Sequence, residues 1–261
     1  MIDSKNFIRV NNLPKIGSKV AVAMSGGVDS SVTAALLKFT GYDVVGITMK
    51  LYESSSKKNP KTCCSGIDIS DARNVAKKLG IKHYIIDYKE RFKKSVIDKF
   101  VDSYIEGNTP IPCILCNQTV KFTDMISFSK KINCKILATG HYVKRIEKDG
   151  DINLYQADDD NKDQSYFLFS TTQEQLATLR FPLGVYSKDL IRSLAKKFEL
   201  SVSTKPDSQD ICFIPDGNYR EFVKKQKPKT MEPGIIEDVN GNIVGKHEGI
   251  VNFTVGQRKG I

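Results

Sequence analysis

The sequence has no apolar run approaching the length needed to cross a lipid bilayer. Its first ten residues, MIDSKNFIRV, lack the basic start and the apolar core of a secretory signal. An internal repeat and a low-complexity tract are absent too. The lack of a bilayer-spanning run and of a secretory signal argues against a membrane or secreted protein, and we expect a cytoplasmic chain with no membrane partner.

Cysteine is infrequent, with six residues in 261, and no secretory context accompanies it. A structural disulfide framework is therefore not expected, and the cysteine spacing points to metal binding or catalysis instead. Lysine and arginine total 40 against 30 acidic residues, which gives a formal net charge of +10. A basic surface attracts nucleic acids, although a generally lysine-rich composition gives the same charge without that function.

The first two-thirds of the chain alternates short apolar runs with amphipathic segments. The apolar runs predict strands at Lys19–Met24, Val44–Leu51, His83–Asp87 and Lys135–Thr139. The amphipathic segments predict helices at Ser30–Phe39, Asp68–Leu79, Arg91–Ile105 and Asn117–Lys131. This alternation predicts an α/β fold with an open, mostly parallel sheet and helices on both faces.

The pattern changes after the fourth predicted strand. A hairpin is expected across Asp149-Gly150, followed by helices at Ser165–Leu179 and Ser187–Leu200. Beyond Pro206 the chain is richer in turns, and GIIEDV, NIVG and GIVNFTV are expected to form short strands. We therefore predict one domain over residues 1–205 and a small β-rich domain over 206–261.

The string Ser25-Gly26-Gly27-Val28-Asp29-Ser30 lies between the first predicted strand and the first predicted helix. Two glycines let the backbone turn sharply and approach an oxyanion, and Ser30 or Ser31 can cap the helix. Exposed N–H groups and the helix dipole then favour phosphate. The GxxxxGK[ST] spacing of a Walker A loop is absent. The full string resembles the PP-loop of enzymes that adenylate a carbonyl oxygen with ATP and release pyrophosphate.

Three further residues are expected near this loop, because ligands of an open α/β sheet bind at the carboxyl ends of its strands. Met49 lies near the end of the second predicted strand, and Gly140 and His141 follow the fourth. Core packing for Met49 and a turn for Gly140 are the alternatives. Asp29 is the local candidate for holding Mg²⁺, with a capping or turn role as its alternative.

The pair Cys113-Ile114-Leu115-Cys116 follows two prolines and precedes a predicted helix. A helix N-terminus stabilises a thiolate, so Cys116 is predicted to be reactive. The spacing also occurs in half a zinc site, a redox pair or an iron–sulfur ligand pair. Cys63-Cys64 would complete a four-cysteine site only with strained chelation of a single ion.

Two cysteines stand alone in the sequence. Cys212 follows the polar run Asp207-Ser208-Gln209-Asp210, which weakens the alternative that it is a buried core cysteine. Cys134 precedes a predicted strand and is expected in the core.

Eight strings, in order over nearly the whole chain, closely resemble the tRNA-specific 2-thiouridylases of the MnmA family. They are AVAMSGGVDSSV, ITMKLY, CCSGIDISDARNVAKKLGI, GNTPIPCILCNQTVKF, ILATGHYV, KDQSYFL, DSQDICFI and FTVGQRKGI. The resemblance implies that ATP, with Mg²⁺, adenylates the C2 oxygen of the wobble uridine of tRNA. Cys212 would carry sulfur as a persulfide, delivered by a cysteine desulfurase or a relay protein. Cys116 would be the second catalytic thiol, releasing sulfide or forming a disulfide with Cys212.

The resemblance also implies the binding residues. ATP is expected at Ala23, Met24, Ser25, Gly26, Gly27, Val28, Asp29, Ser30, Met49 and Gly140. The target base is expected at Ile111, Pro112 and Cys113, and other parts of the tRNA at His141, Lys162, Asp163 and Gln164. Residues 1–205 would then be the ATP-binding catalytic domain with a helical tRNA-contact region.

The sequence departs from the family pattern in two ways. Some members carry aspartate where this chain has Cys113, so three thiols are available, and Cys113, Cys116 and Cys212 could hold a [4Fe–4S] cluster whose open iron carries sulfide. Family members also continue into a C-terminal β-barrel, which is expected to be missing here. Besides the persulfide and cluster routes, an ATP pyrophosphatase acting on another carbonyl substrate stays open.

Overall fold

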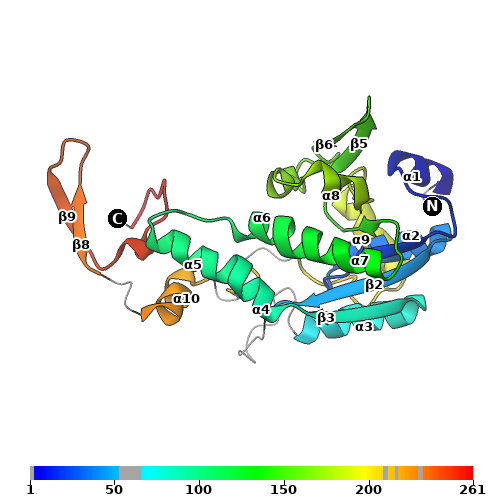
Figure 1. Ribbon diagram of the computed structural model, residues 1–261, viewed down its shortest axis with the longest axis horizontal. Coiled ribbons are helices and arrows are strands. Elements are labelled where there is room, and N and C mark those ends of the chain that lie inside the picture. Colours follow the sequence, from blue (N-terminus) through cyan, green and yellow to red (C-terminus); the bar gives the residue numbers. More distant parts are fainter. Residues whose placement is uncertain (1–2, 53–65, 208–210, 215–216, 229–231, 261) are drawn as a thin grey trace.

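A five-stranded parallel sheet organises the chain, in the order β3-β2-β1-β4-β7 (Figure 1). The computed structural model describes residues 3–52, 66–207, 211–214, 217–228 and 232–260. The strands are β1 (Lys19–Ala23), β2 (Asp43–Lys50), β3 (Lys82–Asp87), β4 (Leu137–Ala138) and β7 (Leu179–Arg180). The predicted open parallel sheet is confirmed, although β4 is shorter than expected.

Helices cover both faces of the sheet, as predicted. One face packs against α1 (Ser4–Val10), α2 (Val28–Thr40), α3 (Gly66–Leu79) and α9 (Lys188–Lys197). The other packs against α4 (Lys89–Phe92), α5 (Asp98–Ile105), α6 (Pro112–Cys116), α7 (Met125–Lys131) and α8 (Gln173–Thr178). Strand β1 shows why two layers form: Val20 and Val22 join the first core, whereas Ala21 between them joins the second.

Two of the predicted helices contain wide π-type turns. The segment η1 (Lys93–Ile97) joins α4 to α5, and η2 (Asn117–Asp124) joins α6 to α7. The second of these helices begins at Pro112 rather than at Asn117. Proline suits the first helical position because its fixed φ is helical and its missing N–H would have no partner there.

The prediction of one continuous helix over Ser165–Leu179 is wrong, because the helix is interrupted in its middle and its last residue belongs to a strand. The segment divides into the 3₁₀ helix η3 (Ser165–Leu168) and α8, because Thr172 caps a new helix through a capping box with Gln175. Leu179 and Arg180 then pair with β4 as the fifth strand. A two-residue strand directly after a helix leaves no periodic signal in the sequence.

The predicted hairpin across Asp149-Gly150 is confirmed. It joins β5 (Lys144–Lys148) to β6 (Asp151–Tyr155). Asp149 and Gly150 both take positive φ angles, 54° and 88°, as a two-residue type I′ turn requires.

The C-terminal region is only partly as expected. The hairpin of β8 (Gly234–Glu237) and β9 (Ile243–His247) is present and projects from one end of the molecule (Figure 1). The helix α10 (Tyr219–Gln226) was not predicted, and η5 (Ile250–Asn252) is a 3₁₀ turn where a strand was expected. Val223 and Val251 join the second core. The boundary near residue 206 stays a prediction.

Within the described ranges, no helix combines the length and the apolar character needed to span a bilayer.

Candidate nucleotide and thiol site

The phosphate loop leads directly from β1 into α2. Gly27 is the N-cap of α2, and no side chain caps this end of the helix. The prediction that Ser30 or Ser31 caps α2 is wrong, because both lie inside the first turn. There the Ser31 hydroxyl donates to the Gly27 carbonyl at 2.7 Å, and the Ser30 hydroxyl accepts from the Ser25 N–H at 3.1 Å. The first N–H groups of a 13-residue helix therefore remain available to an anion.

Close backbone approaches explain the glycines at positions 26 and 140. Gly26 has φ +77°, and a Cβ there would lie 2.1 Å from the Asp68 carbonyl oxygen. A Cβ on Gly140 would lie 2.7 Å from the Ser30 nitrogen and 2.8 Å from the Asp29 carbonyl carbon. Gly140, the second residue after β4, therefore packs against the start of α2.

We expect Gly140→Ala to displace the phosphate loop, because the atoms that the new methyl group meets are backbone atoms. ATP affinity should fall by about tenfold or more, with a loss of about 1–3 kcal/mol in unfolding free energy. Gly66→Ala is the matched control, since a Cβ there meets nothing within 4 Å. Equal ATP affinity of the two variants, measured by calorimetric titration, would contradict this packing.

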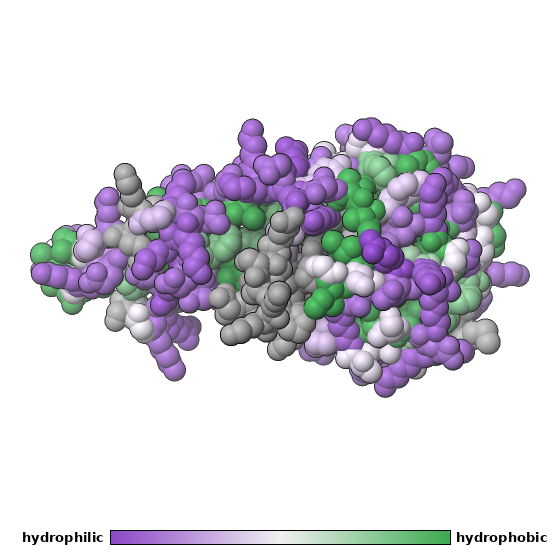
Figure 2. Space-filling view, turned by 90° about the horizontal axis from the view of Figure 1, so that it is seen from below, coloured by the Kyte–Doolittle hydropathy of each residue, from purple (hydrophilic) through white to green (hydrophobic). Residues whose placement is uncertain are grey.

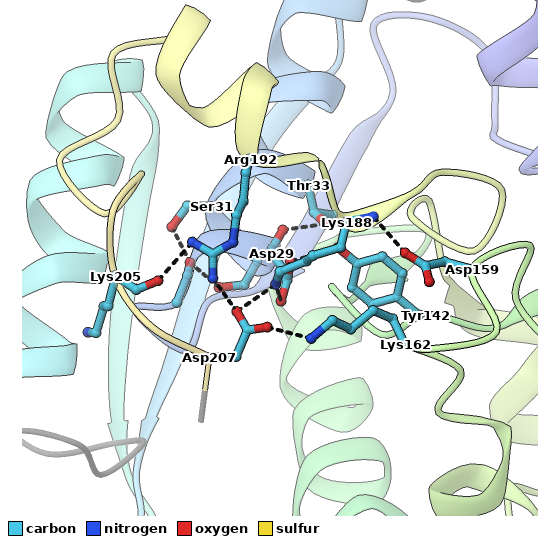
Figure 3. Close-up of polar contacts among 12 residues, drawn as sticks. Asp29, Ser31, Thr33, Tyr142, Asp159, Lys162, Lys188, Arg192, Lys205 and Asp207 are labelled. Atoms are coloured by element: carbon cyan, nitrogen blue, oxygen red, sulfur yellow. Dashed lines mark hydrogen bonds and ion pairs between the residues drawn. The ribbon is translucent and has the colours of Figure 1, made fainter. Parts of the chain in front are cut away.

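The carboxylate of Asp29 is engaged within the protein (Figure 3). Lys188 donates to both of its oxygens, at 2.7 and 2.8 Å, and the Tyr142 hydroxyl donates to it at 2.9 Å. Burial and the Asp29 charge raise the pKa of Tyr142, so this hydroxyl stays a donor. The predicted Mg²⁺ role of Asp29 would require a metal to compete with the Lys188 ammonium.

Asp207 is a second carboxylate that pairs with Lys188. Its carboxylate accepts from Lys162 at 2.8 Å and Arg192 at 2.7 Å, and pairs with Lys188 at 2.9 Å. Burial alone would raise the pKa of Asp207, but the bonds from Lys162 and Lys188 lower it to about 2. Asp29 and Asp207, far apart in sequence, are thus joined through one buried lysine.

Lys205 completes the polar surroundings of the loop. Its ammonium donates to the Gly26 carbonyl at 3.0 Å and to the carboxylates of Asp68 and Asp71 at 2.6 Å each. The local sequence around Lys188, Lys205 and Asp207 predicts no role for these three residues. Asp207 does belong to one of the strings that resemble the family, DSQDICFI. Lys188 and Lys205 belong to none, and a sequence does not show that a lysine is buried.

The predicted tRNA contacts at 162–164 have partners inside the protein. Lys162 binds Asp207, Asp163 accepts from the Ala157 N–H at 2.8 Å, and Gln164 accepts from the Tyr142 N–H at 3.0 Å.

His141 is packed among aromatic rings. Its ring lies edge-on to Phe122 and Phe181, and its Nδ1 is 2.9 Å from the Thr139 hydroxyl. Burial and the neighbouring Lys121 charge lower the pKa of His141 to about 3. The imidazole is therefore neutral at pH 7, and a tRNA contact here would be a hydrogen bond rather than an ion pair.

The CxxC motif forms the short helix α6. Ile111 is the N-cap and Pro112 the first helical residue, so Cys113 lies in the first turn and Cys116 almost a turn further on. The prediction that Cys116 sits at the helix N-terminus is therefore wrong; Cys113 has that position. Cys116 is instead buried in the second core. Its reactivity cannot be argued from the helix dipole alone.

Cys212 lies in a turn that the core holds in place. The Ile214 N–H donates to the Ile211 carbonyl at 2.8 Å, which closes the turn around it. Phe213 is buried with its ring against Phe92 and Phe100. Cys212 is half-buried and packs against the same core that contains Cys116.

Cys134 and Met49 lie in the core, whereas Cys63 and Cys64 lie outside the described residues. Cys134 is buried, as predicted, and burial raises the pKa of its thiol. Met49 is also buried, in the second core. Cys63, Cys64 and Ser208-Gln209-Asp210 lie outside the described residues. Among the residues that are described, no three His, Cys, Asp or Glu side chains are arranged to hold a metal ion.

The parallel sheet and the uncapped, glycine-lined loop define a nucleotide-binding α/β domain of the PP-loop class. Two family models match the chain: the tRNA methyl transferase HUP domain over residues 18–216, and the tRNA methyl transferase PRC-barrel domain over 220–261. Among solved structures, NMN synthetase from Francisella tularensis is similar in fold, with a TM-score of 0.50 and 16% identity over 86% of this chain and 84% of that one.

Curated relatives are far more similar in sequence. The tRNA-specific 2-thiouridylase MnmA of Bradyrhizobium sp. (strain ORS 278) is 56% identical over 94% of this chain and 62% of the relative. That of Rickettsia massiliae (strain Mtu5) is 54% identical over 96% of this chain and 69% of the relative. The chain belongs to the MnmA family. It spans 62% of the length of the first of these relatives.

Proposed function

We propose that this chain catalyses ATP-dependent 2-thiolation of the wobble uridine of tRNA. The observation that supports it most is that the chain combines an open phosphate loop with Cys116, which is buried in the second core, and Cys212, which packs against that core. The name of the family model refers to a tRNA methyl transferase, whereas the curated relatives are named 2-thiouridylases. The thiols of Cys116 and Cys212 at the same core favour sulfur chemistry.

ATP fits the residues around the loop. The start of α2 presents N–H groups, and Gly26 and Gly140 keep side chains away from the backbone there. Bound ATP would activate the uridine C2 oxygen by adenylation and so make it a leaving group. Lys188 and Lys205 contact the loop directly, at Asp29 and Gly26, and Lys162 and Arg192 bind Asp207, the partner of Lys188. Mg²⁺ is the expected counter-ion of the phosphates.

A three-cysteine [4Fe–4S] cluster is the competing route. Among the described residues, Cys113, Cys116 and Cys212 do not form a group that could hold a metal ion. We propose the persulfide route, which uses Cys212 and Cys116 alone. The terminal sulfur of a Cys212 persulfide attacks C2 and displaces AMP. Cys116 then attacks the Cys212 sulfur, which frees 2-thiouridine and leaves a disulfide that an external thiol must reduce.

The partners follow from this chemistry: tRNA with a wobble uridine, and a persulfide donor such as a cysteine desulfurase or a relay protein, in the cytoplasm.

The first half-reaction tests the proposal without the sulfur donor. Pyrophosphate release from ATP should rise when a tRNA transcript with a wobble uridine is added. A transcript with cytidine at that position is the matched control, because it differs in the base alone. If pyrophosphate release is equal with both transcripts, or absent with both, the proposed substrate is wrong.

A further inference from the structure

Two aromatic side chains stand exposed on η3 and just after it. Tyr166 is 61% exposed and Phe169 is 70% exposed, and their ring centroids lie 6.4 Å apart with an interplanar angle of 47°. Single exposed apolar residues need no explanation, but rings gathered on one surface indicate a binding site. Hydrophilic residues cover most of the face shown in Figure 2, with hydrophobic residues in separate patches.

The backbone that carries the rings is held firmly. Asp163 accepts hydrogen bonds from both the N–H and the hydroxyl of Ser165, and the Gln164 N–H donates to the Tyr142 carbonyl at 2.8 Å. Leu168, between the two aromatic residues, is fully buried. An anchored segment therefore presents both rings to solvent, and a ligand that binds them need not order the backbone first.

The segment that carries the two rings contacts α6, the helix that contains Cys116. Asn117, directly after Cys116, donates from Nδ2 to the Phe167 carbonyl at 3.2 Å. The helix η3 also contacts α6, which contains Pro112 and Cys113, the predicted contacts of the target base. The aromatic pair thus continues a surface already expected to meet RNA.

The charges nearby favour a base over a phosphate. The protein as a whole carries +10 and attracts RNA. The segment just before the rings contains Asp158, Asp159 and Asp160. Lys144 pairs with Asp158, so Asp159 and Asp160 supply the acidic charge that repels a phosphate but does not oppose the uncharged face of a base. A uridine that reaches a partly buried thiol must leave the stack of its neighbours, and a neighbouring base then lacks a stacking partner.

We propose that Tyr166 and Phe169 form a stacking platform for an unpaired RNA base that flanks the modified uridine. This inference rests on the proposed function. Aromatic stacking of bases is tolerant of sequence, because every base has a π-face. The platform therefore contributes to affinity and to positioning the uridine, rather than to recognition of the uridine itself.

Affinity for an anticodon stem-loop RNA tests the platform. Tyr166→Ala and Phe169→Ala should each weaken binding by about 5- to 100-fold, whereas Tyr166→Phe and Phe169→Tyr should bind like the wild type. Phe39→Ala is the matched control: Phe39 is 66% exposed but stacks on Phe198 near the C-terminal end of α2, away from the phosphate loop. A photocrosslink from 5-iodouridine beside the wobble position should map to 166–169.

The outcomes separate this inference from the proposed function. If the double alanine variant binds RNA as tightly as the wild type, the platform is wrong even though the wild type binds RNA. If RNA affinity is unchanged but sulfur delivery from a persulfide donor is lost, the rings contact a protein and the RNA platform is again wrong. A wild-type chain that binds no RNA would overturn the proposed function and the platform together.

Discussion

Cys212→Ser should abolish tRNA thiolation while leaving ATP binding intact. A serine hydroxyl cannot carry a persulfide, so 2-thiouridine formation should fall on the order of 10³-fold or more. Adenylation should continue, because Cys212 belongs to the turn held by Phe213 and not to the phosphate loop. Quantifying 2-thiouridine and pyrophosphate in the same reaction separates the two half-reactions.

Cys134→Ser is the matched control for this loss. Cys134 is buried in the second core, against which Cys212 packs, and the new hydroxyl there costs about 1–3 kcal/mol of stability. Below its melting temperature this variant should still thiolate tRNA. An active Cys212→Ser enzyme, or an inactive but folded Cys134→Ser enzyme, would contradict the assigned roles.

Lys188→Met should destabilise the protein more than the loss of any surface charge. The Lys188 side chain is 8% exposed and lies between the carboxylates of Asp29 and Asp207. Its removal leaves two partly buried charges facing each other, which costs on the order of 3 kcal/mol. Chemical denaturation measures this loss. Lys78→Met, which breaks an exposed pair with Glu199, should cost about 0.5 kcal/mol or less.

Acid should reduce the difference between Lys188→Met and the wild type. The folded-state pKa of Asp207 is about 2, below its ordinary value of 3.8. Its stabilising contribution is therefore present above pH 3.8 and is lost as the pH falls through about 2. Without Lys188 the pKa moves back toward 3.8, so the variant loses less from this group on acidification. Parallel stability curves between pH 5 and 2 would contradict this role of Lys188.

The sequence predicted the nucleotide-binding half of the fold well, because buried parallel strands and glycine-terminated helices leave strong local patterns. Gly41 is an example: it ends α2 with φ +100°, where the sequence predicted the stop. Strand β7 could not be predicted, since Leu179 and Arg180 become a strand only by pairing with β4. Helix α10 lay in a region expected to be turns and strands.

The candidate site was predicted in part. The approach of Gly140 to Ser30 shows that the chain after β4 lies against the start of α2, next to the phosphate loop that follows β1. The position of Cys116 was misjudged, because the proline-rich approach to it turned out to contain the first helical residue, Pro112. The network of Lys188 and Asp207 depends on burial and on contacts between distant segments, which local sequence patterns do not show.

Nucleoside mass spectrometry of tRNA tests the central claim most directly. The chain, purified without oxygen and shown to be free of iron, is incubated with a wobble-uridine transcript, ATP, Mg²⁺ and a persulfide donor. The account predicts 2-thiouridine that disappears when ATP is omitted or when Cys212→Ser replaces the wild type. Formation of 2-thiouridine only by iron-loaded protein, or equally without ATP, would contradict it.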